Sequence, residues 1–271
     1  MRPGGRTAAA RADWALARTL FWRGHFEESR ALLAAVRLDT LTPEADADAR
    51  LELLIPAQLS WALAALGDID GAHTQAECAL NWAQAQPEPP VTASGYLGLL
   101  HCFLDMPEAA LAWSRRTQAA ATRNAPSGLY QHAKLLEYWA LSRLGQPCDE
   151  AGAQTALLAL RRLGAAHEAR AFSIYAQGAF HQSPLHACTQ LDAALDLNAR
   201  CGLHHWEARL LQMKSRSLDA AGQLHAASRF LKLAKETAQR QRAWLFLGQF
   251  ESIESRTHVS SRIGDAGFAS R

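Results

Sequence analysis

The chain has 271 residues, of which 49% are hydrophobic, so it is long enough for one or two globular domains or one elongated repeat array. Its 28 Lys and Arg nearly balance 26 Asp and Glu, and the net charge of +2 creates no broad field for nucleic acid or anionic lipid. The composition therefore argues against a polyanionic partner.

The cysteines and the apolar segments indicate a soluble, cytoplasmic protein. Five cysteines stand singly at positions 78, 102, 148, 188 and 201, and an odd number without any CxxC pair suits a reducing compartment. Near the N-terminus, Asp13, Arg18 and Arg23 interrupt the apolar run, unlike in a signal peptide. No stretch of about 18 apolar residues occurs without a charge or a break.

The residue types predict an all-α protein with a repeating unit. Ala, Leu, Arg, Gln and Glu dominate, whereas Val and Ile are scarce. Turn-like breaks follow one another at spacings of 43, 38, 40, 37 and 40 residues, at Gly24, Gly67, Asp105, Gly145, Gln182 and Gly222. A spacing near 40 along the whole chain predicts a right-handed α-solenoid of about six helical hairpins.

Taken in chain order, the apolar periodicity predicts two helices around each break. The hairpins are expected at 8–36, 51–82, 96–123, 129–163, 167–200 and 204–240, followed by a capping helix at 241–254. We expect a disordered N-terminus at 1–7, a repeat domain at 8–256 and a disordered tail at 257–271.

The residues at the breaks follow a pattern of three positions. A turn residue, most often glycine, is followed two places later by an aromatic, apolar or proline residue, and three places after that by alanine. Gly222, Leu224 and Ala227 show this pattern. The same pattern occurs at positions 67/69/72, 105/107/110 and 182/184/187, and at 24/26/29 with serine in place of alanine. The chain thus resembles tetratricopeptide-type (TPR) repeats, with a repeat longer than the usual ~34 residues. In the fourth unit Glu150 takes the alanine position, which indicates an irregular or offset pair.

Three local segments carry two resemblances to bacterial regulatory proteins. The segment 104–112, LDMPEAALA, is similar to the repeat arrays of ATPase-type transcriptional regulators. The segments 14–24 and 207–222 resemble the sensory halves of signalling proteins, including diguanylate cyclases. The resemblance implies either a free-standing adaptor or a sensory module without its output domain.

No pattern of catalytic or ligand residues accompanies the repeats. The sets His181/His186/Cys188 and Cys201/His204/His205 lack the paired spacing of a closed metal site. There is no GxSxG, phosphate-binding loop or HExxH motif. The neighbours His101 and Cys102 point in different directions on a helix. We therefore expect no enzymatic activity, no metal and no cofactor.

The family resemblance places the first helix of each pair along a concave groove. The candidate partner-binding residues are Trp22, a tryptophan of the first helix, and six residues that alignment by the turns puts near the groove: Arg18, Trp61, Trp139, Arg209, Gln212 and Arg216. Arg and Trp are the residue types that most often anchor interfaces. The alternative for the tryptophans is that they fill the gaps between repeats, as large aromatic residues usually do.

The leading hypothesis is a non-catalytic scaffold or adaptor that binds a protein or peptide in its concave groove, in bacterial signalling or transcriptional regulation. The alternative is a sensory module of a diguanylate cyclase or ATPase-type regulator, separated from its output domain, that binds a small-molecule inducer. Neither hypothesis involves nucleic acid or a membrane directly.

Overall fold

The computed structural model describes residues 3–38, 50–86, 90–124, 127–179 and 183–248, and these residues contain no β-strand. The helices, in chain order, are α1 (Pro3–Trp22), α2 (Phe26–Ala34), α3 (Leu51–Ala65), α4 (Ile69–Gln84), α5 (Val91–Phe103), α6 (Pro107–Asn124), α7 (Ser127–Arg143), α8 (Glu150–Arg161), α9 (Ala165–Gly178), α10 (Pro184–Cys201), α11 (Glu207–Ala220) and α12 (Leu224–Gln241). The predicted all-α class is confirmed.

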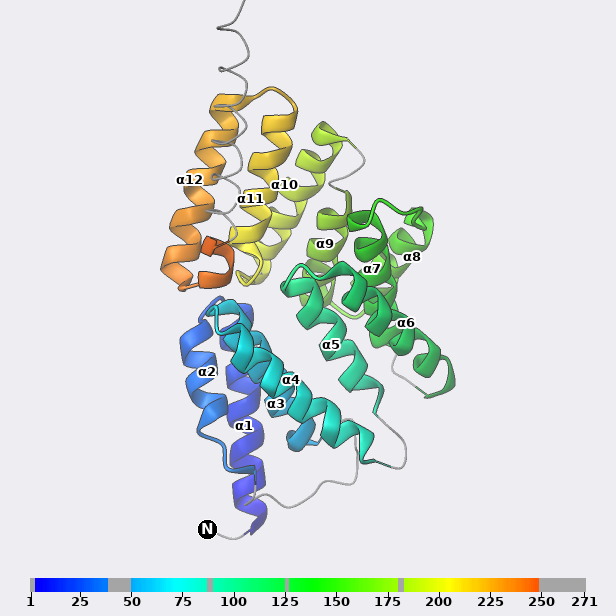
Figure 1. Ribbon diagram of the computed structural model, residues 1–271, viewed down its shortest axis with the longest axis vertical. Coiled ribbons are helices and arrows are strands. Elements are labelled where there is room, and N and C mark those ends of the chain that lie inside the picture. Colours follow the sequence, from blue (N-terminus) through cyan, green and yellow to red (C-terminus); the bar gives the residue numbers. More distant parts are fainter. Residues whose placement is uncertain (1–2, 39–49, 87–89, 125–126, 180–182, 249–271) are drawn as a thin grey trace, which may run out of the picture.

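Consecutive helices form hairpins that stack in sequence order (Figure 1). Each odd-numbered helix packs on the next odd-numbered helix, so α1, α3, α5, α7, α9 and α11 form an inner layer. The even-numbered helices pack on this layer from outside. The result is an all-α solenoid of six hairpins within the described residues, as the spacing of the turns predicted.

Each helix has a sequence that suits its layer. Helix α3, LELLIPAQLSWALAA, is buried around most of its circumference because other helices cover it on several sides. Helix α12 instead buries a narrow stripe that includes Ala227, Ala234 and Ala238 and turns its charged side chains outward. An inner helix therefore has to be apolar nearly all round, whereas an outer helix needs one apolar face.

The turns within the hairpins share one helix-ending geometry. The backbone is left-handed at Gly24, Gly67, Gly145 and Gly222, with φ between 66° and 83°, and at Asp105, with φ of 60°. The following N–H donates to a carbonyl five residues earlier at all five turns, at 2.8 to 3.0 Å. This is the Schellman motif, which suits glycine because a Cβ is disfavoured there. The sixth predicted turn residue, Gln182, lies outside the described residues.

Small residues lie where the two helices of a pair cross. Ser29, Ala72, Ala110, Ala187 and Ala227 are all buried, with at most 6% of the residue exposed. In the fourth hairpin the turn is longer: Asp149 caps α8 by accepting a hydrogen bond of 2.8 Å from the Gly152 N–H. Ala153 is therefore the buried crossing residue, which explains why Glu150 breaks the sequence pattern.

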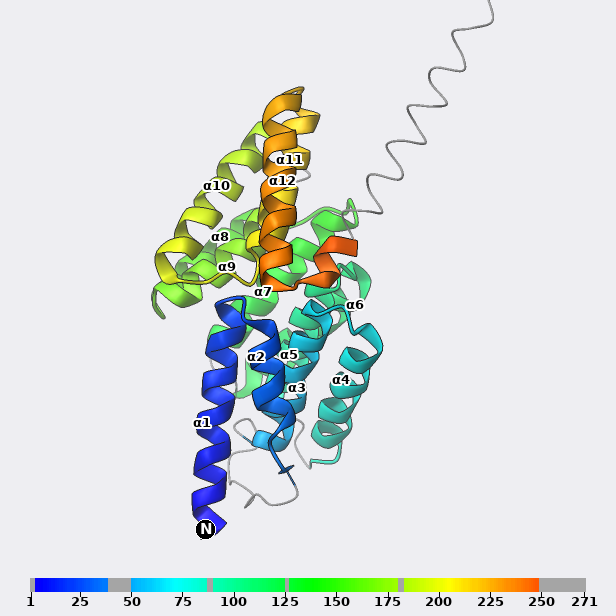
Figure 2. The same ribbon diagram turned by 90° about the vertical axis from the view of Figure 1, so that its left-hand side faces the viewer.

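The sixth hairpin returns to the first, so that α11 and α12 stand end to end above α1 and α2 (Figure 2). The carbonyl of Trp22 accepts hydrogen bonds from the backbone N–H of His204, at 2.7 Å, and of His205, at 3.3 Å. Arg242 also donates to the carboxylate of Glu27. Contact between the two ends of the array therefore closes off part of the expected concave groove.

The contact continues along the ends of the second and third hairpins. Arg209 donates to the carbonyl of Phe103 at 3.2 Å and to the carboxylate of Asp105 at 2.8 Å. The rings of Phe103 and Phe246 lie 5.2 Å apart, centroid to centroid. We call this set of contacts the closing seam: Trp22, Glu27, Phe103 and Asp105 on one side, and His204, His205, Arg209, Arg242 and Phe246 on the other.

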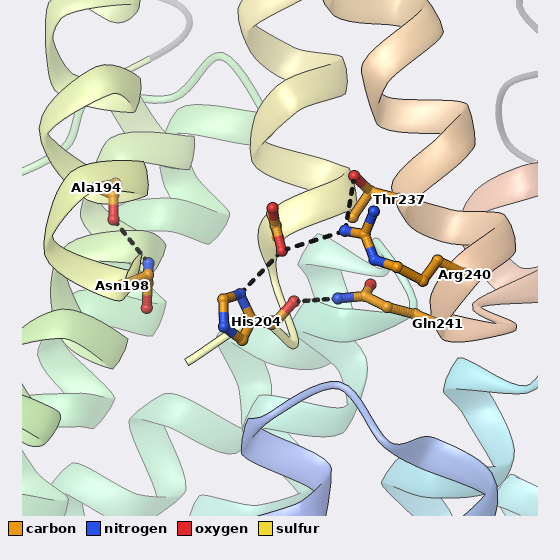
Figure 3. A network of polar contacts seen from close by, with 7 residues as sticks. Ala194, Asn198, His204, Thr237, Arg240 and Gln241 are labelled. Atoms are coloured by element: carbon orange, nitrogen blue, oxygen red, sulfur yellow. Dashed lines mark hydrogen bonds and ion pairs between the residues drawn. The ribbon is translucent and has the colours of Figure 1, made fainter. Parts of the chain in front are cut away.

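A polar network holds the turn that enters the seam (Figure 3). Gln241 donates to the carbonyl of His204 at 2.9 Å, and the His204 Nδ1 lies 3.0 Å from the carboxylate of Glu207. Arg240 reaches the same carboxylate at 3.9 Å and the hydroxyl of Thr237 at 3.3 Å. The turn before α11 is thus fixed to the end of α12, which orients its N–H groups toward Trp22.

The ends of the chain differ from the predicted boundaries. Helix α1 begins at Pro3, so residues 3–7 belong to the first helix rather than to a disordered segment. After Arg242, whose φ of 53° ends α12, residues 244–248 are helical, and Phe246 packs into the seam. The beginning of the expected capping helix thus covers the seam rather than the outer face of α12. The rest of that helix and the tail at 257–271 lie outside the described residues.

Candidate binding pocket on the concave face

Closure of the array leaves a pocket of about 170 Å³ on its inner side. Every odd-numbered helix up to α9 contributes to it, together with the turn before α11. The lining residues are Arg18, Phe21 and Trp22 from α1, Trp61 from α3, Tyr96, Leu99 and Phe103 from α5, Leu129 and His132 from α7, Arg170 and Ile174 from α9, and His205 and Trp206. We call this the concave pocket.

Helical spacing brings these residues to one face. Arg18, Phe21 and Trp22 lie three and four residues apart, which is the spacing of neighbours on a helix surface. Arg170 and Ile174 are separated by the same single turn. Since the odd-numbered helices turn one face toward the inside of the array, these side chains converge on one volume.

Aromatic rings form most of the pocket wall. The rings of Trp61 and Tyr96 are stacked at 4.6 Å with an interplanar angle of 21°, and the Trp61 indole N–H donates to the Tyr96 carbonyl at 3.1 Å. Trp22 meets Trp61 edge-on at 5.6 Å and His205 edge-on at 4.5 Å. Such a mutually packed wall is rigid and presents ring faces and edges to an apolar guest.

Two arginines supply the charge of the pocket. The Arg170 guanidinium lies 4.8 Å from the ring centre of Trp22, and the Arg18 guanidinium lies 4.4 Å from that of Trp14. No Asp or Glu lines the pocket, and neither arginine takes part in an ion pair among the described residues. Burial and the nearby charge of Arg18 lower the pKa of Arg170. The pocket therefore has a positive charge that no carboxylate of its lining balances.

Several polar atoms of the lining have no hydrogen-bond partner among the described residues. They are the indole N–H of Trp22, the Nδ1 of His132 and both ring nitrogens of His205, whose residue is only 1% exposed. Burial lowers the pKa of His132 to about 3 and that of His205 well below 6.5, and Arg170 acts in the same direction on both. Both rings are thus neutral at pH 7 and can each donate or accept one hydrogen bond.

The structure separates the seven predicted groove residues into two groups. Arg18, Trp22 and Trp61 line the concave pocket. The other four residues, Trp139, Arg209, Gln212 and Arg216, do not line it. Trp139 has no exposed surface, so its side chain fills the core between repeats, which is the alternative that the sequence left open.

The remaining three predicted residues lie near the seam or within the sixth hairpin. Arg209 is 4% exposed and is committed to Asp105 and the Phe103 carbonyl. Gln212 is 5% exposed and buried in α11. Arg216 is exposed, and partial desolvation of its guanidinium together with the charge of Arg143 lowers its pKa. This part of α11 therefore helps to close the array.

Sequence reasoning missed Tyr96, Arg170 and His205 as pocket residues. Tyr96 and Arg170 lie on first helices, as did the residues that were predicted, but alignment by the turns did not select them. His205 lies in a turn between hairpins and reaches the pocket only because the array closes. The available signal on α9 was Arg170 one helical turn before the apolar Ile174, and on α5 it was only an aromatic residue on a first helix.

The neighbouring pair His101 and Cys102 offers no activated nucleophile. Cys102 is fully buried, and burial raises the pKa of its thiol to about 12. The His101 Nδ1 is 2.7 Å from the Leu97 carbonyl, one helical turn back. The thiol is therefore protonated at neutral pH, and the imidazole is engaged with the backbone.

The described residues contain no group of three or more His, Cys, Asp and Glu side chains placed to hold a metal ion. None of their helices has the length and apolarity needed to cross a membrane.

Comparison with known proteins gives no match to a protein-family model, a curated protein or a solved structure. The fold and the pocket thus define the chain as an all-α helical-repeat protein with a small aromatic and cationic pocket.

Proposed function

We propose that the protein is a non-catalytic, TPR-like binding module of bacterial signalling or transcriptional regulation. Its partner is a protein or peptide that seats an apolar group in the concave pocket. The observation that carries this proposal is the wall of aromatic rings contributed by successive first helices. The five free cysteines are in keeping with a cytoplasmic location.

The size and chemistry of the pocket support one anchoring group rather than a long peptide footprint. A volume of about 170 Å³ is close to the ~150 Å³ of a protein cavity that accepts benzene. Trp, Tyr and Arg are enriched at the few positions that dominate binding energy at interfaces. A single apolar side chain of the partner therefore fits the pocket, and further contacts lie along its rim.

The test compares two tryptophans by affinity capture from a lysate of the native host. Trp22 lines the pocket and is half-buried, whereas Trp82 on α4 is also half-buried but lies outside the pocket. A specific partner is expected to be retained by the wild-type protein and by Trp82→Leu, and to be lost from Trp22→Leu. Equal retention by the two variants would contradict the pocket assignment.

A second candidate function is recognition of a small-molecule inducer by the same pocket. The closing seam favours it, because contact between the two ends of the array limits the room for an extended peptide. Thermal-shift screening of the purified chain separates the two functions. A small molecule that raises the melting temperature of the wild type but not of Trp22→Leu would support the second candidate over the first.

A further inference from the structure

The concave pocket combines an apolar wall with positive charge that is not neutralised by its surroundings. Arg18 and Arg170 both line it, and the described residues provide neither with a carboxylate. Arg170 is half-buried and Arg18 is exposed at the mouth of the pocket, so Arg170 is partly withdrawn from water without a carboxylate to offset the cost. A pocket of this kind is suited to an anion brought by the ligand.

The two arginines lie close enough to influence each other. The charge of Arg18 lowers the pKa of Arg170, and both charges oppose the increase that burial causes in the pKa of Tyr96. Like charges held together around one volume repel, and an anion placed between them relieves that repulsion. Guanidinium groups match the two oxygens of a carboxylate particularly well.

Unpartnered polar atoms mark the inner part of the pocket. Within the described part of the chain, neither ring nitrogen of His205, which is only 1% exposed, has a hydrogen-bond partner, and the buried indole N–H of Trp22 also lacks one. The rings of these two residues meet edge-on at 4.5 Å. A neutral imidazole and an indole each have one N–H to donate, so both can supply a hydrogen bond to an anionic oxygen.

We infer that the concave pocket binds a carboxylate attached to an apolar body of about one ring, with the carboxylate held by Arg18 and Arg170 and the body packed against Trp61 and Tyr96. This inference rests on the proposed function and specifies the group that enters the pocket. The same chemistry is present in a free aromatic or aliphatic acid and in a peptide that carries a carboxylate beside an apolar side chain.

Titration calorimetry of the full chain with matched probes tests the inference. Phenylacetate and phenylacetamide have nearly the same shape and differ in charge. We expect phenylacetate to bind about ten- to a hundredfold more tightly, the usual advantage of hydrogen bonds to a charged group. Arg18→Gln and Arg170→Gln should each remove most of this difference, by weakening the binding of phenylacetate far more than that of phenylacetamide. Arg200→Gln, at an exposed arginine paired with Asp196, is the matched control and should behave as the wild type.

Two peptides identify the source of the carboxylate. Acetyl-Ala-Ala-Phe with a free carboxyl terminus and its C-terminal amide are titrated beside the two small probes. Tighter binding of the free-acid peptide than of phenylacetate would assign the pocket to a peptide partner. The reverse order would assign it to a small acid. Either order supports the inference, provided that the free acid binds more tightly than its amide.

The outcomes separate the inference from the proposed function. Equal binding of the acid and the amide, by the wild type and by both arginine variants, would overturn the anion assignment and leave an apolar binding pocket. Absence of binding by all four probes would overturn the assignment of this pocket as the anchoring site as well. Because Arg18 is exposed on α1, Arg18→Gln is expected to fold even if Arg170→Gln does not, and circular dichroism and melting temperature check both.

Discussion

Arg209 on α11 donates a hydrogen bond of 2.8 Å to Asp105, a residue 104 positions earlier in the chain. Arg143 donates to the other oxygen of the same carboxylate at 2.6 Å. Burial alone raises the pKa of Asp105, but the two arginines outweigh it and hold that pKa below its usual 3.8. Asp105 also takes the left-handed turn position that glycine has in the first, second, fourth and sixth hairpins. One side chain thus ends a helix and joins distant hairpins.

Loss of this ion pair should destabilise the closed array. Arg209→Met removes a guanidinium that is 4% exposed and leaves Asp105 with Arg143 alone, so we expect a loss of about 2 kcal/mol in the free energy of unfolding. The control is Arg115→Met, where the arginine is 60% exposed and paired with Glu137, and where the loss should stay below about 1 kcal/mol. Urea denaturation measures both. Equal losses of unfolding free energy in the two variants would mean that the Arg209–Asp105 pair stabilises the protein no more than an ion pair on the surface does.

Gly67 and Gly145 form a matched pair for testing the seam. Both have positive φ, of 83° and 66°. A Cβ at Gly67 would lie 3.1 Å from the Cβ of Trp244, whereas a Cβ at Gly145 would meet nothing within 4 Å. Substitution by alanine should therefore cost about 1 to 2 kcal/mol at Gly145, from the left-handed backbone alone, and more at Gly67. Equal melting temperatures for the two variants would place Trp244 away from Gly67 in solution.

Trp139 and Trp22 should have separable roles. Trp139 is completely buried, so Trp139→Ala is expected to lower the free energy of unfolding by about 3 to 5 kcal/mol. Trp139→Phe, which keeps most of the apolar volume, should fold and retain the partner captured by the wild type. Trp22→Leu should show the opposite pattern, with a smaller loss of stability and loss of the partner. If Trp139→Phe folds but does not retain the partner, Trp139 contributes to the binding site and the assignment of this residue to the core alone is wrong.

Acid should weaken the fold through its buried histidines. His205 and His132 stay neutral in the folded protein well below pH 6.5, whereas both take up a proton near that pH once the chain unfolds. The stability that the two neutral histidines contribute is therefore fully present above pH 6.5. As the pH falls below 6.5, the free energy of unfolding decreases by up to about 1.4 kcal/mol per pH unit for each histidine. Arg170 and His204 face His205 and disfavour its protonation further.

His205→Phe should therefore reduce the slope of unfolding free energy against pH between about pH 6 and 5, while His132 continues to contribute. Urea titrations at half-unit pH steps measure this slope. A variant whose slope equals that of the wild type would show that His205 is not buried in its neutral form.

The hairpins were predictable because their signals are local. A glycine that ends one helix and an alanine where the next helix crosses it, such as Gly67 and Ala72, lie within a few residues of each other and recur along the chain. The offset fourth pair follows the same logic once the Asp149 cap is recognised. Local chemistry therefore specified both the class of fold and the number of repeats.

The curvature of the array was not predictable in this way, and neither was most of the pocket lining. Closure depends on small angles accumulated between hairpins, and it is fixed by pairs such as Arg209 with Asp105 that no sequence spacing connects. Trp61 and Trp139 are the same residue type on equivalent helices, yet one lines the pocket and the other is core. His205 joined the pocket solely through closure. Which side chains meet inside a closed array is a tertiary property.

The central claim is that the two ends of the array meet in solution and thereby enclose the pocket. Pulsed electron–electron double resonance tests it with spin labels at the exposed positions Glu28 on α2 and Gln239 on α12, after replacement of the native cysteines. The account predicts a single narrow distribution of distances at the short end of the measurable range. A broad distribution at long distances would show an open array, and the pocket as described here would not exist.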